Sequence, residues 1–168
     1  MREPRFREWE QYHSPTPNAR NRILELNLMI NVLEKGSLAN DPNAPRRWEA
    51  DRELALADCY AHRWSAQQYV WCVDDFLAHP QLSAGPTGYR IGGGDKAPLR
   101  GGAAAQEALK EVQARYEQVI AHHAGTPWVW AARNSRGFTI TRYAIGPEFP
   151  QRSTPGGPQP KPVRAPKL

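Results

Sequence analysis

The sequence predicts an α+β fold that is mainly α, with three to four helices packed against a C-terminal two-stranded antiparallel hairpin, and with extended termini. Three segments, residues 22–34, 46–79 and 103–123, carry apolar residues at helical spacing. A fourth segment, residues 126–145, has β-forming residues on either side of an Asn-Ser-Arg-Gly turn sequence. The 168 residues are enough for one domain with a sizeable core.

Composition shifts divide the chain into three parts. We expect an N-terminal arm over residues 1–14, a single α+β domain over residues 15–146 and a Pro-rich basic tail over residues 147–168. The arm has charges of both signs and no apolar run, so we expect it to be neither a signal peptide nor a transit peptide. The tail is expected to be extended, since seven of the sixteen prolines fall between residues 146 and 168.

The segment 22–34 fits two secondary structures. With helical periodicity, one face collects Ile23, Leu26, Ile30 and Leu33. With strand periodicity, the residues that share a face are Leu24, Leu26, Leu28, Ile30 and Val32. We favour the helix, because Leu, Glu, Met and Lys are good helix formers and Asn is poor in strands.

The middle of the chain predicts two helices around a glycine-rich loop. The helix over residues 46–79 is either continuous or broken at Ser65, where Ser65 and Gln68 have the spacing of a capping box. Residues 81–102 hold seven of the thirteen glycines, which indicates a loop, with room for a short strand at residues 89–91. A clear apolar stripe predicts the next helix over residues 103–123.

The predicted hairpin has a bulged three-residue loop that begins after Asn134 and ends at Gly137. In that register one face becomes a core face, and Arg142 falls opposite Trp130, where it could stack on the indole ring. The apolar members of this face are Trp128, Trp130, Ala132, Phe138 and Ile140. A lone hairpin is marginally stable, so Trp128 and Trp130 should face either the helices or a partner chain.

Positive charge is concentrated at the C-terminal end of the chain. Residues 118–168 carry seven Lys or Arg and one acid, Glu148, whereas residues 1–117 carry fifteen basic and sixteen acidic residues. This asymmetry predicts contact with a negatively charged partner. The residues expected to make it are Arg133, Arg136, Arg142, Arg152, Lys161, Arg164 and Lys167.

The leading interpretation is a non-enzymatic small subunit of a larger assembly, nucleoprotein or virion-like, in the cytoplasm or a virion. Its basic hairpin and tail would contact DNA, RNA or an acidic partner. Aromatic residues would contact protein partners of the assembly, and the candidates are Trp128, Trp130, Phe6 and Trp9. We expect no cofactor and no membrane association.

Two alternatives remain open from the sequence. Cys59 and His62 lie three residues apart with Asp58 beside them, so an enzyme or enzyme accessory subunit with a metal site there is possible. Separately, the order of helix, hairpin and basic tail over residues 103–168 resembles a winged-helix arrangement in outline, which implies a DNA-binding regulator. The helix over residues 103–123 has three acids against two bases, a poor match for phosphates.

Overall fold

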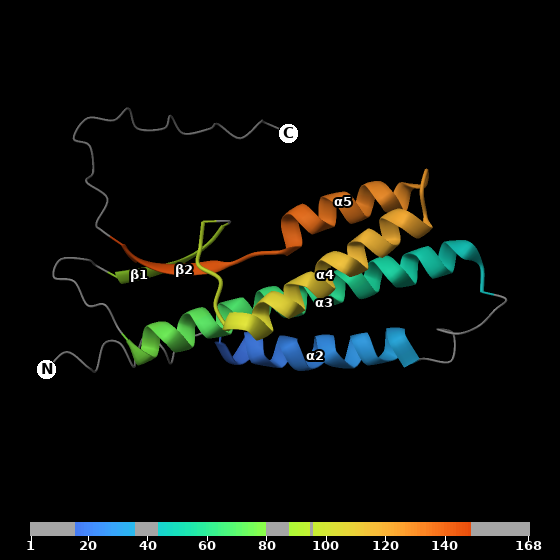
Figure 1. The fold of residues 1–168 in the computed structure, drawn as a ribbon. Helices are drawn as coiled ribbons and strands as arrows, with labels where there is room; N and C mark the ends of the chain where they lie inside the picture. The colour runs from blue at the N-terminus through green and yellow to red at the C-terminus, as the bar shows by residue number, and fades with distance from the viewer. Residues whose placement is uncertain (1–15, 36–43, 80–87, 95, 149–168) are drawn as a thin grey trace, which may run out of the picture.

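The structure is a computed structural model that describes residues 16–35, 44–79, 88–94 and 96–148. These residues form four helices and a two-stranded antiparallel sheet (Figure 1), which confirms the predicted mainly α fold class. The elements, in chain order, are α2 (Thr16–Lys35), α3 (Arg46–Ala78), β1 (Gly88–Gly93), α4 (Gly102–His122), α5 (Pro127–Thr139) and β2 (Tyr143–Glu148). No helix in these parts of the chain has the length and hydrophobicity needed to cross a membrane.

Helix α3 is the centre of the molecule. It contacts α2, α4, α5 and β2, with α2 on one side and α4 and α5 on the other (Figure 1). The helix runs unbroken through Ser65, which decides between the two alternatives for this segment. Because several of its sides are covered, α3 buries thirteen of its 33 residues, including Leu56, Trp64 and Val73.

Helix α2 confirms the helical interpretation of residues 22–34. Leu26 and Ile30 are buried against α3, as the helical periodicity predicts, and Leu33 packs against the same core. Leu24, Leu28 and Val32, which only the strand template placed with Leu26, lie exposed on the other side. The strand template fitted because α2 carries apolar residues on two faces.

The start of α4 is fixed by a close approach to α3. Gly101 precedes the helix with a φ of 87°, in the left-handed region that favours glycine. A Cβ atom here would lie 2.6 Å from Cη2 of Trp71, closer than real contacts allow. One turn later, Trp64 Nε1 donates a 3.0 Å hydrogen bond to the carbonyl oxygen of Ala105. Both tryptophans belong to α3, so α3 sets the position of α4.

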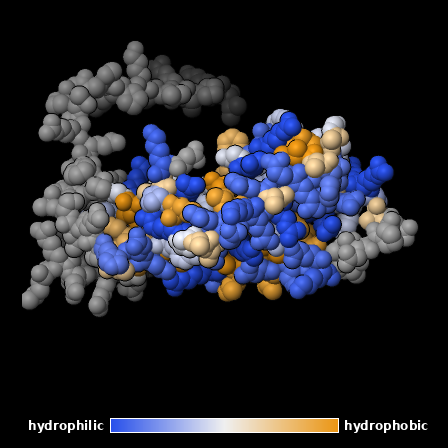
Figure 2. Space-filling view, in the orientation of Figure 1, coloured by the Kyte–Doolittle hydropathy of each residue, from blue (hydrophilic) through white to orange (hydrophobic). Residues whose placement is uncertain are grey.

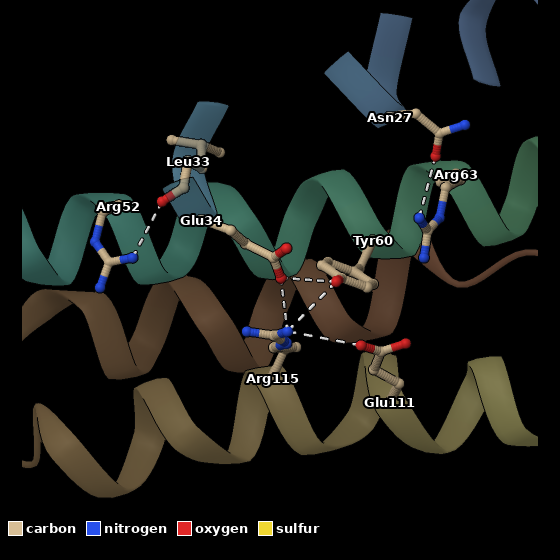
Figure 3. A network of polar contacts seen from close by, with 8 residues as sticks. All are labelled: Asn27, Leu33, Glu34, Arg52, Tyr60, Arg63, Glu111 and Arg115. Carbon is tan, nitrogen blue, oxygen red and sulfur yellow. Dashed lines mark hydrogen bonds and ion pairs between the residues drawn. The ribbon is translucent and has the colours of Figure 1, made fainter. Parts of the chain in front are cut away.

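A polar network ties α2, α3 and α4 together (Figure 3). The Glu34 carboxylate accepts 2.8 Å hydrogen bonds from the Tyr60 hydroxyl and from Arg115 Nη2. Arg115 also lies 3.6 Å from the Glu111 carboxylate, and its guanidinium lies over the Tyr60 ring. Polar groups inside a protein need hydrogen-bond partners, and the Glu34 carboxylate receives its partners from α3 and α4.

The sheet differs from the predicted hairpin. Its strands are β1, from the glycine-rich segment, and β2, with Ile91 opposite Ile145 in the register. The short strand at residues 89–91 is therefore confirmed, whereas the hairpin between residues 126–133 and 138–145 is wrong because residues 127–139 are helical. Arg100 joins the sheet to the bundle by donating to the Tyr143 carbonyl oxygen at 2.7 Å.

Replacing Tyr60 with Phe should lower the free energy of unfolding at neutral pH by about 1 kcal/mol, because the hydrogen bond to Glu34 is lost. Burial, and then the hydrogen bond to Glu34, raise the pKa of Tyr60 from 10 to about 12. The folded protein therefore keeps a proton that the unfolded chain releases above pH 10, and the stability that this proton supplies is lost as pH rises through about 12.

The advantage of the native protein over Tyr60→Phe should accordingly shrink between pH 10 and about 12. Urea denaturation of both proteins over that range measures it, and all other titrating groups cancel in the difference. A difference that stays constant with pH would contradict the role of this network.

Candidate functional site

Helix α5 begins with strong local signals. Thr126 stands before it with extended backbone angles, and Pro127 occupies the first turn, where its missing N–H is not needed. The Thr126 hydroxyl donates to the His123 carbonyl oxygen at 2.5 Å, at the end of α4. These contacts turn the chain sharply from α4 into α5.

The hairpin prediction failed because the segment fits both periodicities. Trp128 and Ala132 lie four residues apart, and both meet the core, with Ala132 fully buried between α3 and α4. Asn134 and Gly137, which are typical of turns, lie inside the helix instead. Burial of one helical stripe therefore outweighs the weak helix propensity of the Asn-Ser-Arg-Gly sequence.

Both ends of α5 are attached to α3. At the start, Trp128 Nε1 donates to Asp51 Oδ1 at 2.6 Å. At the end, the Ser65 hydroxyl donates to the Thr139 carbonyl oxygen at 2.5 Å and accepts from the Thr141 N–H at 2.9 Å. One serine thus satisfies an orphan carbonyl group of the helix end and an amide two residues beyond it.

A buried tyrosine from α4 supports the same end of α5. The Tyr116 hydroxyl donates to Asp58 Oδ1 at 2.7 Å and lies 3.0 Å from the Thr139 hydroxyl. Burial chiefly raises the pKa of Tyr116, and the neighbouring Asp58 carboxylate raises it further, so the phenol stays protonated at neutral pH. The group is a fixed hydrogen-bond donor rather than a proton-transfer site.

The outer side of α5 carries the exposed aromatic residues of this region. Trp130 is 73% exposed and Phe138 is 84% exposed, and Arg133 is exposed between them. With Asn134 and Gly137, these residues span about 140° of the helix surface at 100° per residue. We call this set of five residues the α5 outer face. A Cβ atom added at Gly137 would meet nothing within 4 Å, so the face is open there.

The α5 outer face is also positively charged. The helix contains Arg133 and Arg136 and no acidic residue. Arg136 forms an ion pair with Glu117 of α4. Arg133 is exposed and forms no ion pair with another described residue. A cation beside two exposed aromatic rings has the composition of a nucleic-acid or protein contact surface.

The structure separates several residues that the hairpin would have joined. Trp128 and Trp130 lie two positions apart on one helix and therefore point to different sides, Trp128 to the core and Trp130 outwards. Arg142 lies in the segment between α5 and β2, where its carbonyl oxygen accepts from the Gly94 N–H at 3.0 Å. The predicted stacking of Arg142 on Trp130 depended on the hairpin and is wrong with it.

Phe138 was assigned to the core face and is instead the most exposed large apolar residue in the described segments. A helical reading of residues 127–139 would have placed it beside Trp130, away from Ala132. The other predicted contact residues lie outside the described residues: Phe6, Trp9, Arg152, Lys161, Arg164 and Lys167.

The alternative metal site finds little support in the geometry. Cys59 is buried and His62 is exposed, so they do not share an environment. Burial, and then Asp58, raise the pKa of Cys59, which disfavours the thiolate that binds metals. Asp58 already accepts from Tyr116. No group of three His, Cys, Asp or Glu side chains within the described segments could hold a metal ion.

The winged-helix outline also loses its basis in this structure. The hairpin that would form the wing is helix α5, and the sheet is built from β1 and β2 on either side of α4 and α5 in the sequence. Positive charge in this part of the chain is therefore displayed by a helix.

Replacing Ser65 with Ala should destabilise the protein by about 1 to 3 kcal/mol, because a carbonyl group and an amide would both lose their partner. Amide hydrogen exchange should accelerate first at the end of α5 and at Thr141. Ser135→Ala, within α5 itself, is the control substitution, and it should leave that exchange pattern unchanged. Equal exchange rates in native protein and Ser65→Ala would show that the serine does not anchor α5.

Comparisons of the chain with protein-family models, with curated proteins and with solved structures find no match.

Proposed function

We propose that this protein is a non-enzymatic subunit of a nucleoprotein-like assembly and that the α5 outer face contacts single-stranded nucleic acid. The observation that carries the proposal is the exposure of Trp130 and Phe138 beside Arg133, which has no ion-pair partner among the described residues. In the sequence, the tail over residues 147–168 adds four basic residues, Arg152, Lys161, Arg164 and Lys167, and one acid, Glu148.

The chemistry of the α5 outer face suits unpaired bases. Exposed indole and phenyl rings stack on bases of any sequence, and arginine adds attraction to phosphates. Stacking of this kind requires bases whose faces are free, which single strands and loops provide. Trp130 and Phe138 are eight residues apart, about 12 Å along the helix, so the face can contact more than one nucleotide.

The rest of the bundle favours a single strand over a duplex. A recognition helix needs basic and amide side chains that reach base edges in the major groove. Helix α4 has three acids against two bases. We therefore expect α5 and the tail to make the contacts with nucleic acid.

Replacing Trp130 or Phe138 with Ala should weaken binding to an oligo(dT) or oligo(U) strand by roughly 5- to 100-fold each, the range expected from the loss of one base stack. Replacing Arg133 with Gln should weaken binding less and should lower the salt slope by about 0.7, the value for one phosphate contact with a single strand. Fluorescence anisotropy of a labelled strand across a salt series measures both effects.

Arg22→Gln is the matched charge control, because Arg22 is exposed on α2, a helix that does not contact α5. Gly137→Ala tests packing on the face itself, since its added methyl group meets nothing in the protein. If Arg22→Gln and Arg133→Gln have equal effects, binding depends on net charge alone, and the α5 outer face is not the site.

Deleting residues 151–168 should leave the helical bundle folded and weaken strand binding. The deletion removes Arg152, Lys161, Arg164 and Lys167 and no acidic residue. If all four contact phosphates, the salt slope should fall by about 3. Circular dichroism checks the fold, and anisotropy checks binding. An unchanged slope would show that the tail does not touch the strand.

A further inference from the structure

The two-stranded sheet has one face covered by α3. Tyr143 of β2 lies edge-on to Tyr69 of α3, with ring centroids 5.3 Å apart, and the Tyr89 ring of β1 lies 4.9 Å from the Phe76 ring of α3. Residues that stand opposite each other in an antiparallel pair share a face, and side chains alternate between the faces along each strand. The face that carries Tyr89 and Tyr143 therefore packs on the bundle, and the alternate positions lie on the other face.

The other face is open. A Cβ atom added at Gly92, Gly94 or Gly146 would meet nothing within 4 Å, so no described residue covers the face at these positions. At Gly93, on the covered face, an added Cβ atom would lie 2.7 Å from Cγ2 of Thr141. We call the open face the sheet outer face, and it consists of Arg90, Gly92, Gly94, Arg142, Ala144 and Gly146.

The sheet outer face is positively charged. Arg90 is exposed and Arg142 is half-buried, and neither forms an ion pair or a side-chain hydrogen bond with another described side chain. In the register, the acidic position is Glu148 at the far end of the sheet, and Asp95 lies outside the described residues. Two arginines without a carboxylate partner on an open face favour an anionic ligand.

Large apolar side chains are displayed elsewhere on the molecule. Figure 2 shows hydrophobic residues over α5 and along the edge where Figure 1 places α2. Among the described residues, the exposed large hydrophobics all belong to these two helices and none to the sheet. The core of a protein–protein interface is apolar, and this face lacks the side chains for one. Glycine inside a strand often marks a place where a ligand approaches the backbone closely.

We propose that the sheet outer face binds the phosphate backbone of a single strand, the same strand whose bases stack on the α5 outer face. The choice of a nucleic acid as the anion rests on the proposed function. The connection between the two faces is short, because three residues separate Thr139 at the end of α5 from Tyr143 at the start of β2. In Figure 1, β2 continues from α5 along α3, which contacts both elements. A strand that leaves Phe138 thus reaches Arg142 without crossing the bundle.

The spacing of the two arginines suits a chain of phosphates. Gly94, whose N–H donates to the Arg142 carbonyl oxygen, lies four residues from Arg90, about 13 Å along β1 at 3.3 Å per residue. The phosphates of a stacked strand follow one another at about 3.4 Å along its axis. The two guanidinium groups therefore bind separate phosphates. Gly92 lies between them and leaves room for the sugar-phosphate chain to pass close to the sheet.

A labelled strand of abasic residues tests the proposal with the full chain, because it has phosphates but no bases to stack on α5. Arg90→Gln and Arg142→Gln should each lower the salt slope of binding by about 0.7, and the double variant by about 1.4. Arg47→Gln should leave the slope unchanged and is the matched control. Arg47 is exposed, has no ion-pair partner among the described residues and precedes Tyr69 by about 33 Å along α3.

Gly92→Val tests the close approach without changing the charge. Valine favours strands, and its Cβ atom meets nothing in the protein, so the sheet should be kept. The branched side chain would hold a phosphate backbone away from the face, so the affinity for the abasic strand should fall. Circular dichroism checks the fold of each variant, and anisotropy measures binding.

Trp130→Ala separates this proposal from the proposed function. It should weaken binding of oligo(dT) and leave binding of the abasic strand unchanged. If it has no effect on oligo(dT) while Arg90→Gln and Arg142→Gln still weaken the abasic complex, the stacking role of α5 is wrong and the sheet outer face stands.

The proposal would be overturned if the native chain did not bind the abasic strand at low salt, or if the double variant kept the native slope. Equal effects of Arg47→Gln and Arg90→Gln would reduce the contact to net charge and also overturn it. Polyglutamate that bound through Arg90 and Arg142 as tightly as the abasic strand would identify an acidic protein as the partner instead.

Discussion

The pairing of three buried polar residues on α3 fixes where α4 and α5 dock. Glu53 lies 3.2 Å from ring nitrogens of both His122 and His123, so it holds the end of α4. Ser65 binds the end of α5, and the Gln68 side chain makes two hydrogen bonds with the backbone of Arg100, just before α4. Apolar burial on α3 tolerates sliding and rotation of its neighbours, but a buried polar group without its partner costs about 1 to 3 kcal/mol, so these three positions fix the register.

This arrangement explains why the sequence predicted the helices better than their connections. Residues 103–123 have one apolar stripe and one period, and the structure gives α4 within a residue of the predicted bounds. Residues 127–139 contain Trp, Val, Ala and Thr at spacings that fit either period, and burial of one side against α3 and α4 favours the helix. The strand partner of β2 lies some fifty residues earlier, in a segment whose glycines obscured its pairing. Contacts between distant segments leave little trace in local patterns.

The sequence predicted which residue types belong to the α5 outer face, but only partly how they are arranged in space. The sequence names Arg133 and Trp130 as contact candidates, but the predicted hairpin puts Trp130 and Phe138 together on a core face, and both are exposed on α5 instead. On α2, the two competing periodicities were both physically meaningful. Leu26, Ile30 and Leu33 pack in the core with α3, and the additional residues of the strand template, Leu24, Leu28 and Val32, form a second apolar side. An ambiguous pattern in a helix can thus mark two contact surfaces instead of a choice between structures.

The contact between Gly101 and Trp71 restricts how this sequence can diverge. A smaller residue at position 71 would create space beside position 101, but the φ of 87° would still disfavour any residue with a Cβ atom. A side chain introduced at position 101 would clash with the Trp71 indole. Even if the indole moved aside, the left-handed backbone at position 101 would stay strained. The tryptophan can therefore change while the glycine persists, whereas a change at position 101 is disfavoured with or without the tryptophan.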